Sequence, residues 1–214
     1  MKTKIAILLA AAIGAAGCST IERSRSLANP LTPAKTIAQQ VCSNCHGIDG
    51  NTVSPNFPNL AGQQKTYFIA QLKEFRGHNR LDPEGFEYMW GLSRSLTDEQ
   101  IEGLAAYFAT QKPIAPSAAS APISAKGEEI FRKGLPDQGI PACAGCHGDH
   151  GQGNETFPRL AFQHAGYVYK QLIVYKRTDE RPEGGIMKTV AHNLTPADMK
   201  AVSEYVQSFP KDAQ

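Results

Sequence analysis

The sequence lacks the features of several classes of protein. It has no run of charges of one sign, which argues against an arm that binds nucleic acid. A membrane-spanning helix needs about 20 apolar residues, and the most apolar stretch, residues 5–17, has 13. No segment alternates convincingly between apolar and polar residues, so no strand is expected. Hydrophobic residues still make up 41% of the chain, which argues against disorder.

The apolar stretch follows Lys2 and Lys4 and ends in small residues. This order is typical of an export signal, and we interpret residues 1–17 as a signal peptide that directs the protein to the periplasm. A buried hydrophobic helix is the alternative, but it would lack the basic flank and the small-residue end. Removal of this segment would leave 20 basic and 20 acidic side chains. A near-neutral chain is not a binder of polyanions, so no nucleic-acid partner is expected.

Cysteine is scarce, and four of the five cysteines lie in two Cys-X-X-Cys-His motifs. Two thiols on one helical turn can add to the two vinyl groups at one edge of a porphyrin, and the histidine that follows can reach the iron. We therefore expect two covalently bound haem c groups. The expected attachment residues are Cys42, Cys45, Cys143 and Cys146, and the expected proximal iron ligands are His46 and His147.

Two other chemistries use Cys-X-X-Cys pairs. The pairs of a zinc ribbon usually lie 15–20 residues apart around one metal, whereas Cys42 and Cys143 are separated by about a hundred residues. A thioredoxin-like redox pair requires no histidine after it and does not explain two copies. Haem attachment explains both features.

The two halves of the chain agree beyond these motifs. FPNLAGQQKTYFIAQLKEFR (57–76) matches FPRLAFQHAGYVYKQLIVYK (157–176), one hundred residues later. A repeat of roughly 80 residues has the size of a small domain. Residues 113–122 are rich in Pro, Ala and Ser and suit a linker. We expect a tether over 18–33, a first domain over 34–112 and a second over 123–214.

Both halves have helical periodicity. The expected helices cover about 36–42, 64–76 and 101–109 in the first half, and 124–131, 164–177 and 199–209 in the second. Thr97 with Gln100, and Thr195 with Asp198, are start signals for the last helix of each half. The expected fold is all-α, with two tandem haem domains joined by the linker.

At this point the sequence resembles a known family. CSNCHG, FPNLAGQ, Met89 and the LTDEQIEGLAAYF segment look like class I cytochrome c, and the duplication resembles diheme cytochromes of the c4 type. The second copy departs from the pattern in its longer approach GLPDQGIPAC (134–143) and in a less typical last helix. The resemblance implies that the backbone carbonyls of Pro58 and Pro158 accept a hydrogen bond from the proximal histidines. Both prolines could also be ordinary turn residues.

A haem that only transfers electrons needs a second axial ligand. Met89 and Met187 occupy matching positions, each seven residues before a Leu-Thr pair, and we expect them to be the distal ligands in loops before the last helix. Core filling is the ordinary role of a methionine, and we assign it to Met199, which has no matching Met. The spare histidines also have no partner in the other copy; His192, five residues after Met187, is the closest competitor.

We expect an electron carrier and not an enzyme, because two filled axial positions leave no iron open to a substrate. The resemblance implies a quinol–cytochrome c oxidoreductase as donor and a terminal oxidase or reductase as acceptor. One alternative is a haem subunit bound to a dehydrogenase or a sulfide-oxidising flavoprotein. Another is a diheme peroxidase or thiosulfate dehydrogenase, which would need an open iron or an unusual ligand.

Cys18 is left over, directly after the apolar, small-residue stretch. A cysteine in this place suggests a lipoprotein, in which the lipid attaches to the thiol and Cys18 becomes the first residue. Residues 19–33 are polar and contain proline, as a tether between membrane and domain should be. Ordinary signal cleavage that leaves a periplasmic protein with a free thiol is the alternative.

Overall fold

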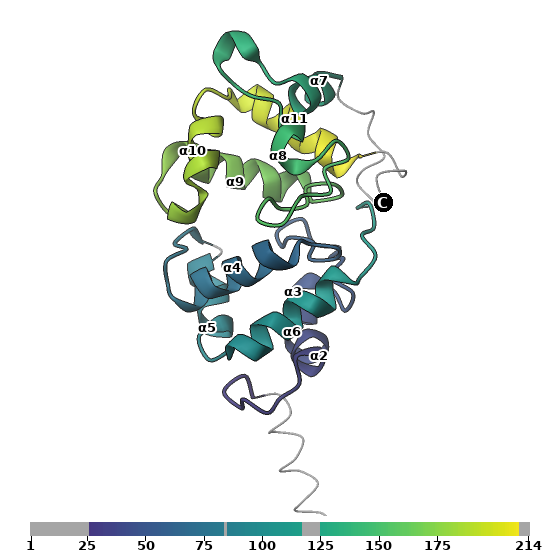
Figure 1. Cartoon of the computed structure of the whole chain (residues 1–214), viewed down its shortest axis with the longest axis vertical. Coiled ribbons are helices and arrows are strands. Elements are labelled where there is room, and N and C mark those ends of the chain that lie inside the picture. The colour runs from purple at the N-terminus through teal and green to yellow at the C-terminus, as the bar shows by residue number, and fades with distance from the viewer. Residues whose placement is uncertain (1–25, 84, 117–124, 210–214) are drawn as a thin grey trace, which may run out of the picture.

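The structure of the protein, a computed structural model, describes residues 26–83, 85–116 and 125–209. Its helices form two units stacked along the long axis, which we refer to as domain 1 (up to residue 116) and domain 2 (from residue 125) (Figure 1). No strand occurs among the described residues, as expected for an all-α fold. The expected signal peptide, Cys18 and the first half of the tether lie outside the described residues.

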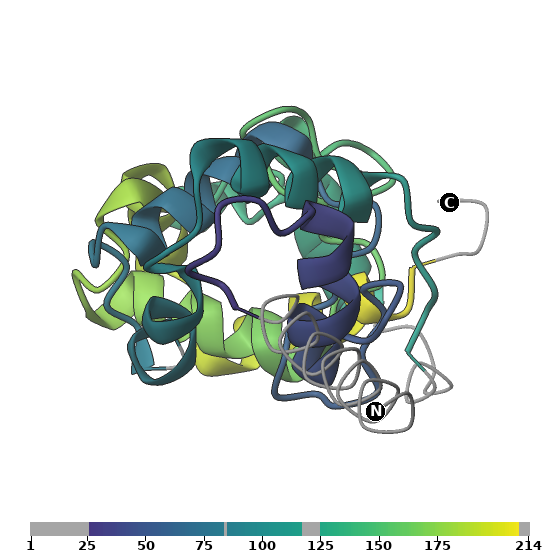
Figure 2. The same cartoon turned by 90° about the horizontal axis from the view of Figure 1, so that it is seen from below.

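Domain 1 begins with a helical run that ends in the first Cys-X-X-Cys-His motif. The run contains a π-helical turn that ends at Cys42, the first residue of the motif, and this rare conformation is frequent at functional sites. The helices of domain 1 are α2 (Ala34–Ile37), η1 (Ala38–Cys42), α3 (Ser43–His46), α4 (Lys65–Arg76), η2 (Gly85–Met89), α5 (Trp90–Ser93) and α6 (Asp98–Ala109). Seen from below in Figure 2, α2 and the loop that precedes it lie on the outer end of domain 1, against α6.

Domain 2 repeats this order with a longer approach to its motif. After α7 the chain turns at Gly134, whose φ of +73° favours glycine, and a short loop joined by a bridge between Leu135 and Ile140 precedes the motif. The helices are α7 (Ala125–Lys133), η4 (Pro136–Gln138), α8 (Ala144–His147), α9 (Ala165–Arg177), η5 (Pro182–Gly184), α10 (Gly185–His192) and α11 (Pro196–Gln207).

Each domain has its own core, and the last helix supplies much of it. In domain 1, Ile101, Leu104 and Phe108 of α6 are buried against α4 and α2. In domain 2, Met199 and Val206 of α11 are buried against α7 and α9. Met199 is fully buried, in agreement with the core role expected from the sequence.

The start signals of the last helices are present as hydrogen-bonded capping boxes. The Thr97 hydroxyl accepts from the Gln100 backbone N–H at 3.2 Å, and the Gln100 side chain accepts from the Thr97 N–H at 3.0 Å. Thr195 and Asp198 make the same pair of bonds, at 3.2 Å each. Each box satisfies two backbone donors that have no partner within the helix, which fixes where α6 and α11 begin.

The two domains contact each other through reciprocal hydrogen bonds. The Gln63 side chain accepts from Arg159 N–H at 2.7 Å and donates to Arg159 O at 3.2 Å. The Gln163 side chain accepts from Asn59 N–H at 2.7 Å and donates to Asn59 O at 2.9 Å. Gln63 is equivalent to Gln163, and Asn59 to Arg159, so each half of the contact repeats the other. This reciprocity defines a two-fold, isologous contact.

The next position along the chain continues this pattern with different chemistry. Gln64 Nε2 donates to Gln152 O at 2.8 Å, and the equivalent His164 places its Nε2 2.9 Å from Thr52 O. Because a carbonyl oxygen only accepts, Nε2 of His164 carries the proton. The identity of Gln63 with Gln163 between the two copies therefore reflects the contact between the domains.

The start of the expected linker is held by domain 1. Asn51 donates from Nδ2 to Lys112 O at 3.0 Å and accepts at Oδ1 from Ile114 N–H at 2.8 Å. Ala115 packs against the core of domain 2. Residues 113–116 thus lie along the boundary between the domains, and residues 117–122 of the expected linker are outside the described ranges.

Candidate functional site

The proximal histidines are held by the same two features in each domain. A helical turn carries each motif and ends at a glycine, Gly47 or Gly148, with φ near +80°. His46 Nδ1 lies 2.9 Å from Pro58 O, and His147 Nδ1 lies 2.9 Å from Pro158 O. A carbonyl requires a donor, so Nδ1 carries the proton and Nε2 keeps its lone pair for a metal.

Both imidazoles are buried, and this controls their protonation. Burial lowers the pKa of His46 and of His147, while the hydrogen bond to the proline carbonyl acts in the opposite direction. The net direction is downward, so both rings are neutral at pH 7. A neutral imidazole with a free Nε2 lone pair is the form that binds iron.

The first cysteine of each motif is a shielded thiol, whereas Cys146 is exposed. Burial raises the pKa of Cys42 to about 12 and that of Cys143 to about 11. None of the four motif cysteines is in a disulfide. Among the described residues, no three His, Cys, Asp or Glu side chains are grouped so as to hold a metal ion. The zinc and redox-pair interpretations of the motifs therefore find no supporting geometry in this part of the chain.

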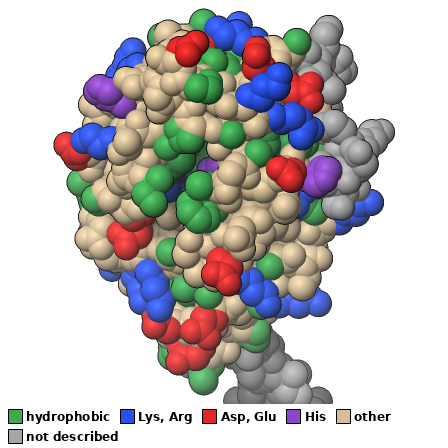
Figure 3. Space-filling view, turned by 45° about the horizontal axis from the view of Figure 1, so that its top comes forward, with side chains coloured by type: hydrophobic (Ala, Val, Ile, Leu, Met, Phe, Trp, Pro, Cys, Tyr) green, Lys and Arg blue, Asp and Glu red, His purple; other side chains and the backbone are tan. Residues whose placement is uncertain are grey.

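A cavity of about 550 Å³ extends through both domains and across their boundary. Its walls are mostly apolar, and Figure 3 shows hydrophobic side chains around a hollow midway along the molecule. The lining includes every expected haem residue: Cys42, Cys45, His46, Met89, Cys143, Cys146, His147, Met187, Pro58 and Pro158. Thiols, an imidazole lone pair and a thioether in an apolar cavity are the donor set and surroundings that haem c requires, so the residues fit the group.

The structure changes one expectation about the methionines. Met89 ends the π-helical turn η2, and Met187 lies in α10, so both occupy helical turns where loops were expected. The Ser93 hydroxyl donates to Met89 O at 2.6 Å and ties this turn to α5. Sequence periodicity missed these turns because η2 is only five residues long, which is too short for a repeating pattern of apolar residues.

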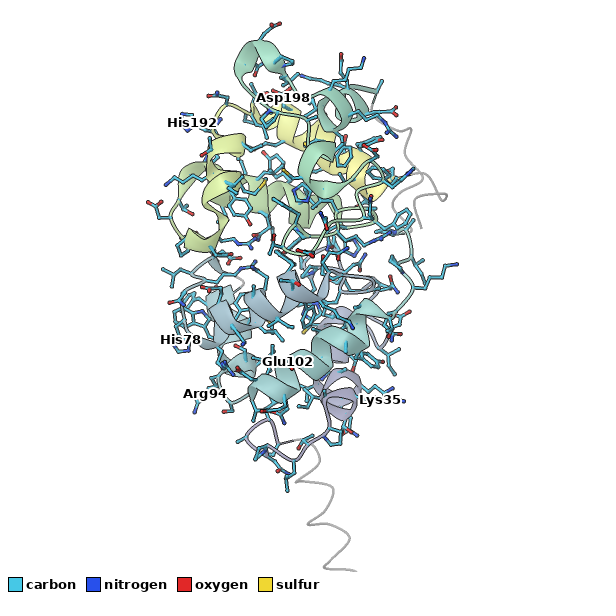
Figure 4. The ribbon with its side chains drawn as sticks, viewed as in Figure 1. Lys35, His78, Arg94, Glu102, His192 and Asp198 are labelled. Atoms are coloured by element: carbon cyan, nitrogen blue, oxygen red, sulfur yellow. The ribbon has the colours of Figure 1, made fainter. Side chains whose placement is uncertain are left out.

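The other histidines lie away from the cavity lining. His78 stacks on Trp90 at a ring distance of 4.1 Å, and Figure 4 places both His78 and His192 at the outer edge of the molecule. His150 is exposed. His164 is buried in the contact between the domains described above.

Sequence reasoning missed a polar centre at the boundary between the domains. Arg80 and Arg181 are almost fully buried and line the cavity. Gln71 Oε1 accepts from Arg80 Nη1 at 2.7 Å and from Arg181 Nη2 at 2.6 Å. Gln171 Oε1 accepts from Arg181 Nη1 at 2.6 Å and from Arg80 Nη2 at 3.4 Å. Each glutamine therefore bridges one arginine from each domain.

Two carboxylates balance the two guanidinium charges. Asp82 receives Arg80 Nε at 2.6 Å and Arg80 Nη2 at 3.0 Å, and its side chain is 0% exposed. Glu183 pairs with Arg181 at 2.8 Å and keeps 19% of its side chain exposed. Burial alone would raise the pKa of Asp82, but its hydrogen bond to Arg80 and the charges of Arg80 and Arg181 hold that pKa below the usual range. Asp82 is therefore ionised at pH 7.

The signal for this centre was present in the sequence. Gln71/Gln171 and Tyr67/Tyr167 are identical pairs in the two copies, and polar identity at buried positions of a repeat indicates a shared contact. The tyrosines take part as well, because Arg80 Nη2 lies 3.4 Å from Tyr167 Oη and Arg181 Nη2 lies 3.5 Å from Tyr67 Oη.

Comparison with known proteins identifies the relatives of this fold. The family model described as cytochrome c matches twice, at residues 31–112 and 124–210. Cytochrome c4 of Stutzerimonas stutzeri is 42% identical over 178 residues, which cover 79% of this chain and 84% of that protein. A thiosulfate dehydrogenase electron acceptor of Thiomonas intermedia is 33% identical over 177 residues, covering 79% of this chain and 78% of that protein.

A solved structure agrees with the sequence relatives. The structure of cytochrome c4 from Acidithiobacillus ferrooxidans superposes with a TM-score of 0.73 at 42% sequence identity. The match covers 78% of this chain and 98% of that chain. The likeness therefore extends over both domains and not over one of them.

Proposed function

The chain belongs to the cytochrome c family, as an electron carrier of the diheme c4 type with two covalently bound haem c groups, and from this premise we propose its place in a respiratory chain. In this proposal it takes electrons in the periplasm from a quinol–cytochrome c oxidoreductase. It passes them to a terminal oxidase or reductase.

The observation that carries the proposal is that each domain brings a motif histidine and a methionine to one apolar cavity. In each domain a neutral, hydrogen-bonded histidine and a methionine line one cavity, so His46 with Met89 and His147 with Met187 would fill both axial positions. When bound, haem c supplies reversible one-electron chemistry. The residues around it hold the thioether links, fix the imidazoles and keep water out.

The chain has nearly equal numbers of basic and acidic side chains, which is consistent with exchange of electrons with several partners. A protein without a strong field of one sign relies on local contacts for docking and not on long-range steering. The test is reconstitution: the purified holoprotein should be reduced by the quinol-oxidising complex and reoxidised by membranes that contain the oxidase. Rates with each partner present alone identify which half of the path fails if turnover is absent.

A second donor is favoured by one specific relative. The Thiomonas protein is named for accepting electrons from thiosulfate dehydrogenase, and it matches over both domains. We propose thiosulfate oxidation as an alternative source of electrons, with the same carrier chemistry at the same sites. Stopped-flow reduction by a thiosulfate dehydrogenase and thiosulfate separates this source from the quinol-oxidising complex. Reduction by thiosulfate alone would instead indicate an enzyme.

We also propose that Cys18 carries a lipid anchor. The position of this cysteine after an apolar stretch supports the proposal, and Cys18 lies outside the described residues. No helix among the described residues has the length and apolar character to span a membrane. Cys18→Ser should release a fully haem-loaded protein from the membrane fraction. An unmodified first residue other than Cys18, found by mass spectrometry of the mature protein, would contradict the anchor.

A further inference from the structure

The polar centre between the domains is not symmetric in its carboxylates. Arg80 and Arg181 each pair with a carboxylate two residues further on, and each contacts both bridging glutamines. Asp82 additionally accepts a hydrogen bond from Gln171 Nε2 of domain 2 at 3.3 Å. Glu183 has no hydrogen bond to domain 1 among those of the described residues. Asp82 thus makes hydrogen bonds to both domains, whereas Glu183 bonds only within domain 2 among the described residues.

Burial makes this asymmetry electrostatically important. Asp82 is 0% exposed, whereas Glu183 keeps 19% of its side chain exposed. A charge in the interior acts over a longer range than one in contact with water, because water screens the second far more strongly. The guanidinium carbon of Arg80 lies 4.5 Å from the centre of the Phe75 ring, and Arg80 also donates to the buried Gln71. These two contacts keep solvent away from the Asp82–Arg80 pair.

The polar centre also lies beside the expected haem sites of both domains. Arg80, Arg181, Gln71 and Gln171 all line the cavity that contains the expected ligands of both domains. Oxidation adds one positive charge to a haem, so a nearby negative charge favours the ferric form and lowers the reduction potential. A charge shared by both domains should therefore act on both haems at once.

We propose that the Asp82–Arg80 pair tunes the reduction potentials of both haems, while Glu183 acts mainly on the haem of domain 2. In this scheme Asp82 acts through its charge and not by contact with iron, and Arg80 and Gln171 hold the carboxylate in place. The proposal rests on each domain holding one haem and is independent of which proteins donate or accept electrons.

The test compares two matched substitutions, Asp82→Asn and Glu183→Gln, in the full-length holoprotein. Potentials are measured without any partner, by redox titration followed through the haem-methyl NMR signals, which report each haem separately. Asp82→Asn removes a buried negative charge and should raise both potentials by amounts that agree within about a factor of two. Glu183→Gln should raise the potential of the domain 2 haem more than that of domain 1. A shift confined to domain 1 in Asp82→Asn overturns the proposal.

The sign of the change in reduction potential distinguishes an effect of charge from an effect of altered structure. Arg80→Gln removes the positive member of the pair, and the charge of Arg181 helps to keep Asp82 ionised, so both potentials should fall. Loosening of the boundary would move both variants in the same direction, and that result also overturns the proposal. If Arg80→Gln does not fold, the neutral double variant Arg80→Gln/Asp82→Asn decides: potentials near those of the unmodified protein support the proposal, and the same rise as in Asp82→Asn contradicts it.

Discussion

Domain 1 and domain 2 hold their motif histidines in the same way but differ in how they close the ends of their helices. In domain 1 the capping-box residue of α6, Gln100, is buried, and its amide donates to Asn29 O at 3.0 Å and to Thr32 O at 3.1 Å. The equivalent Asp198 of α11 is also buried and completes its capping box, but it is a carboxylate and pairs with Lys126 of α7. The same helix start is therefore held by a neutral amide in domain 1 and by an ion pair in domain 2.

The aromatic surroundings of the methionines differ as well. Trp90 follows Met89, donates from its indole nitrogen to Arg80 O at 2.8 Å and stacks on His78. Lys188 follows Met187 and reaches Asp179 on the surface. What the two copies share is the hydrogen bond that holds each motif histidine and the contact between the domains, and what differs is the surface around each methionine. This pattern indicates that the shared parts are under functional constraint.

The largest effects should come from the two methionines that we propose as distal ligands. Met89→Leu and Met187→Leu each remove one thioether, which favours ferrous iron, so each should lower the potential of its own haem by a sizeable part of the ~0.8 V range that axial ligands cover. Each variant should also bind carbon monoxide at one haem per chain, measured by the optical difference spectrum. Stoichiometric binding of carbon monoxide to the unmodified ferrous protein would contradict the two-ligand assignment.

Core truncation should be the next largest effect, and it separates Met199 from the ligand methionines. Ile101 and Met199 occupy equivalent, fully buried positions. Replacement of either by alanine leaves a cavity and should cost about 2–5 kcal/mol of unfolding free energy, measured by denaturant titration. The near-infrared Met–iron band of the ferric protein should be unchanged in Met199→Ala. Loss of that band would assign Met199 to the iron.

The reciprocal contact between the domains should respond symmetrically. Gln63→Ala and Gln163→Ala each remove two hydrogen bonds to the backbone of the other domain. Each leaves a buried backbone N–H without its partner, at a cost of about 1–3 kcal/mol. We expect equal losses of stability in the two variants by thermal or denaturant unfolding. A large difference between them would show that the contact is not isologous.

Acid should weaken the boundary between the domains through Asp82. Because the pKa of this carboxyl is lower in the folded than in the unfolded chain, the stabilisation is present above the unfolded pKa of about 3.9 and is lost as the pH falls through the lower, folded value. Asp82→Asn should reduce the fall in stability between pH 5 and pH 3, measured by denaturant unfolding at each pH. Asp98→Asn is the matched exposed control and should change this profile less.

The smallest effects are expected at the helix caps. Thr97→Ala and Thr195→Ala should each cost about 1 kcal/mol, since each loses a bond to an N3 backbone donor. The loss should be larger for Thr195, because its hydroxyl also donates to the buried Asp198 at 2.6 Å. Helicity by circular dichroism and unfolding free energies measure both. Equal losses would mean that the burial of Asp198 is independent of the cap.

The local features of the fold could be predicted from the sequence, because their signals lie within a few residues of each other. The two repeats, the capping boxes at Thr97 and Thr195 and the core position of Met199 are of this kind. Haem c as the cofactor followed from a five-residue motif whose chemistry has few alternatives. The longest helices matched their periodicity to within a few residues, because amphipathic spacing is strongest in long elements.

The features that could not be predicted depend on which distant residues meet. Arg80 and Arg181 are about a hundred residues apart, but their spacing differs from that of the repeated segments on either side of them. Alignment of the two copies therefore did not pair these arginines. The shared carboxylate Asp82 has no aligned counterpart for the same reason. In the sequence, His164 has no matching histidine in the first copy. In the structure it makes the hydrogen bond across the boundary that the equivalent Gln64 makes from domain 1.

The isologous contact between the domains has a consequence for the chain as a whole. Two separate copies of one domain that met through this face would come apart on dilution, whereas a short connection gives them an effective concentration in the millimolar range. Association then no longer depends on how much protein a cell makes. Because neither half needs to recognise an identical copy, one side of the contact can change alone, as His164 in the place of Gln64 illustrates. A symmetric pair became, by fusion, a molecule with two distinguishable ends.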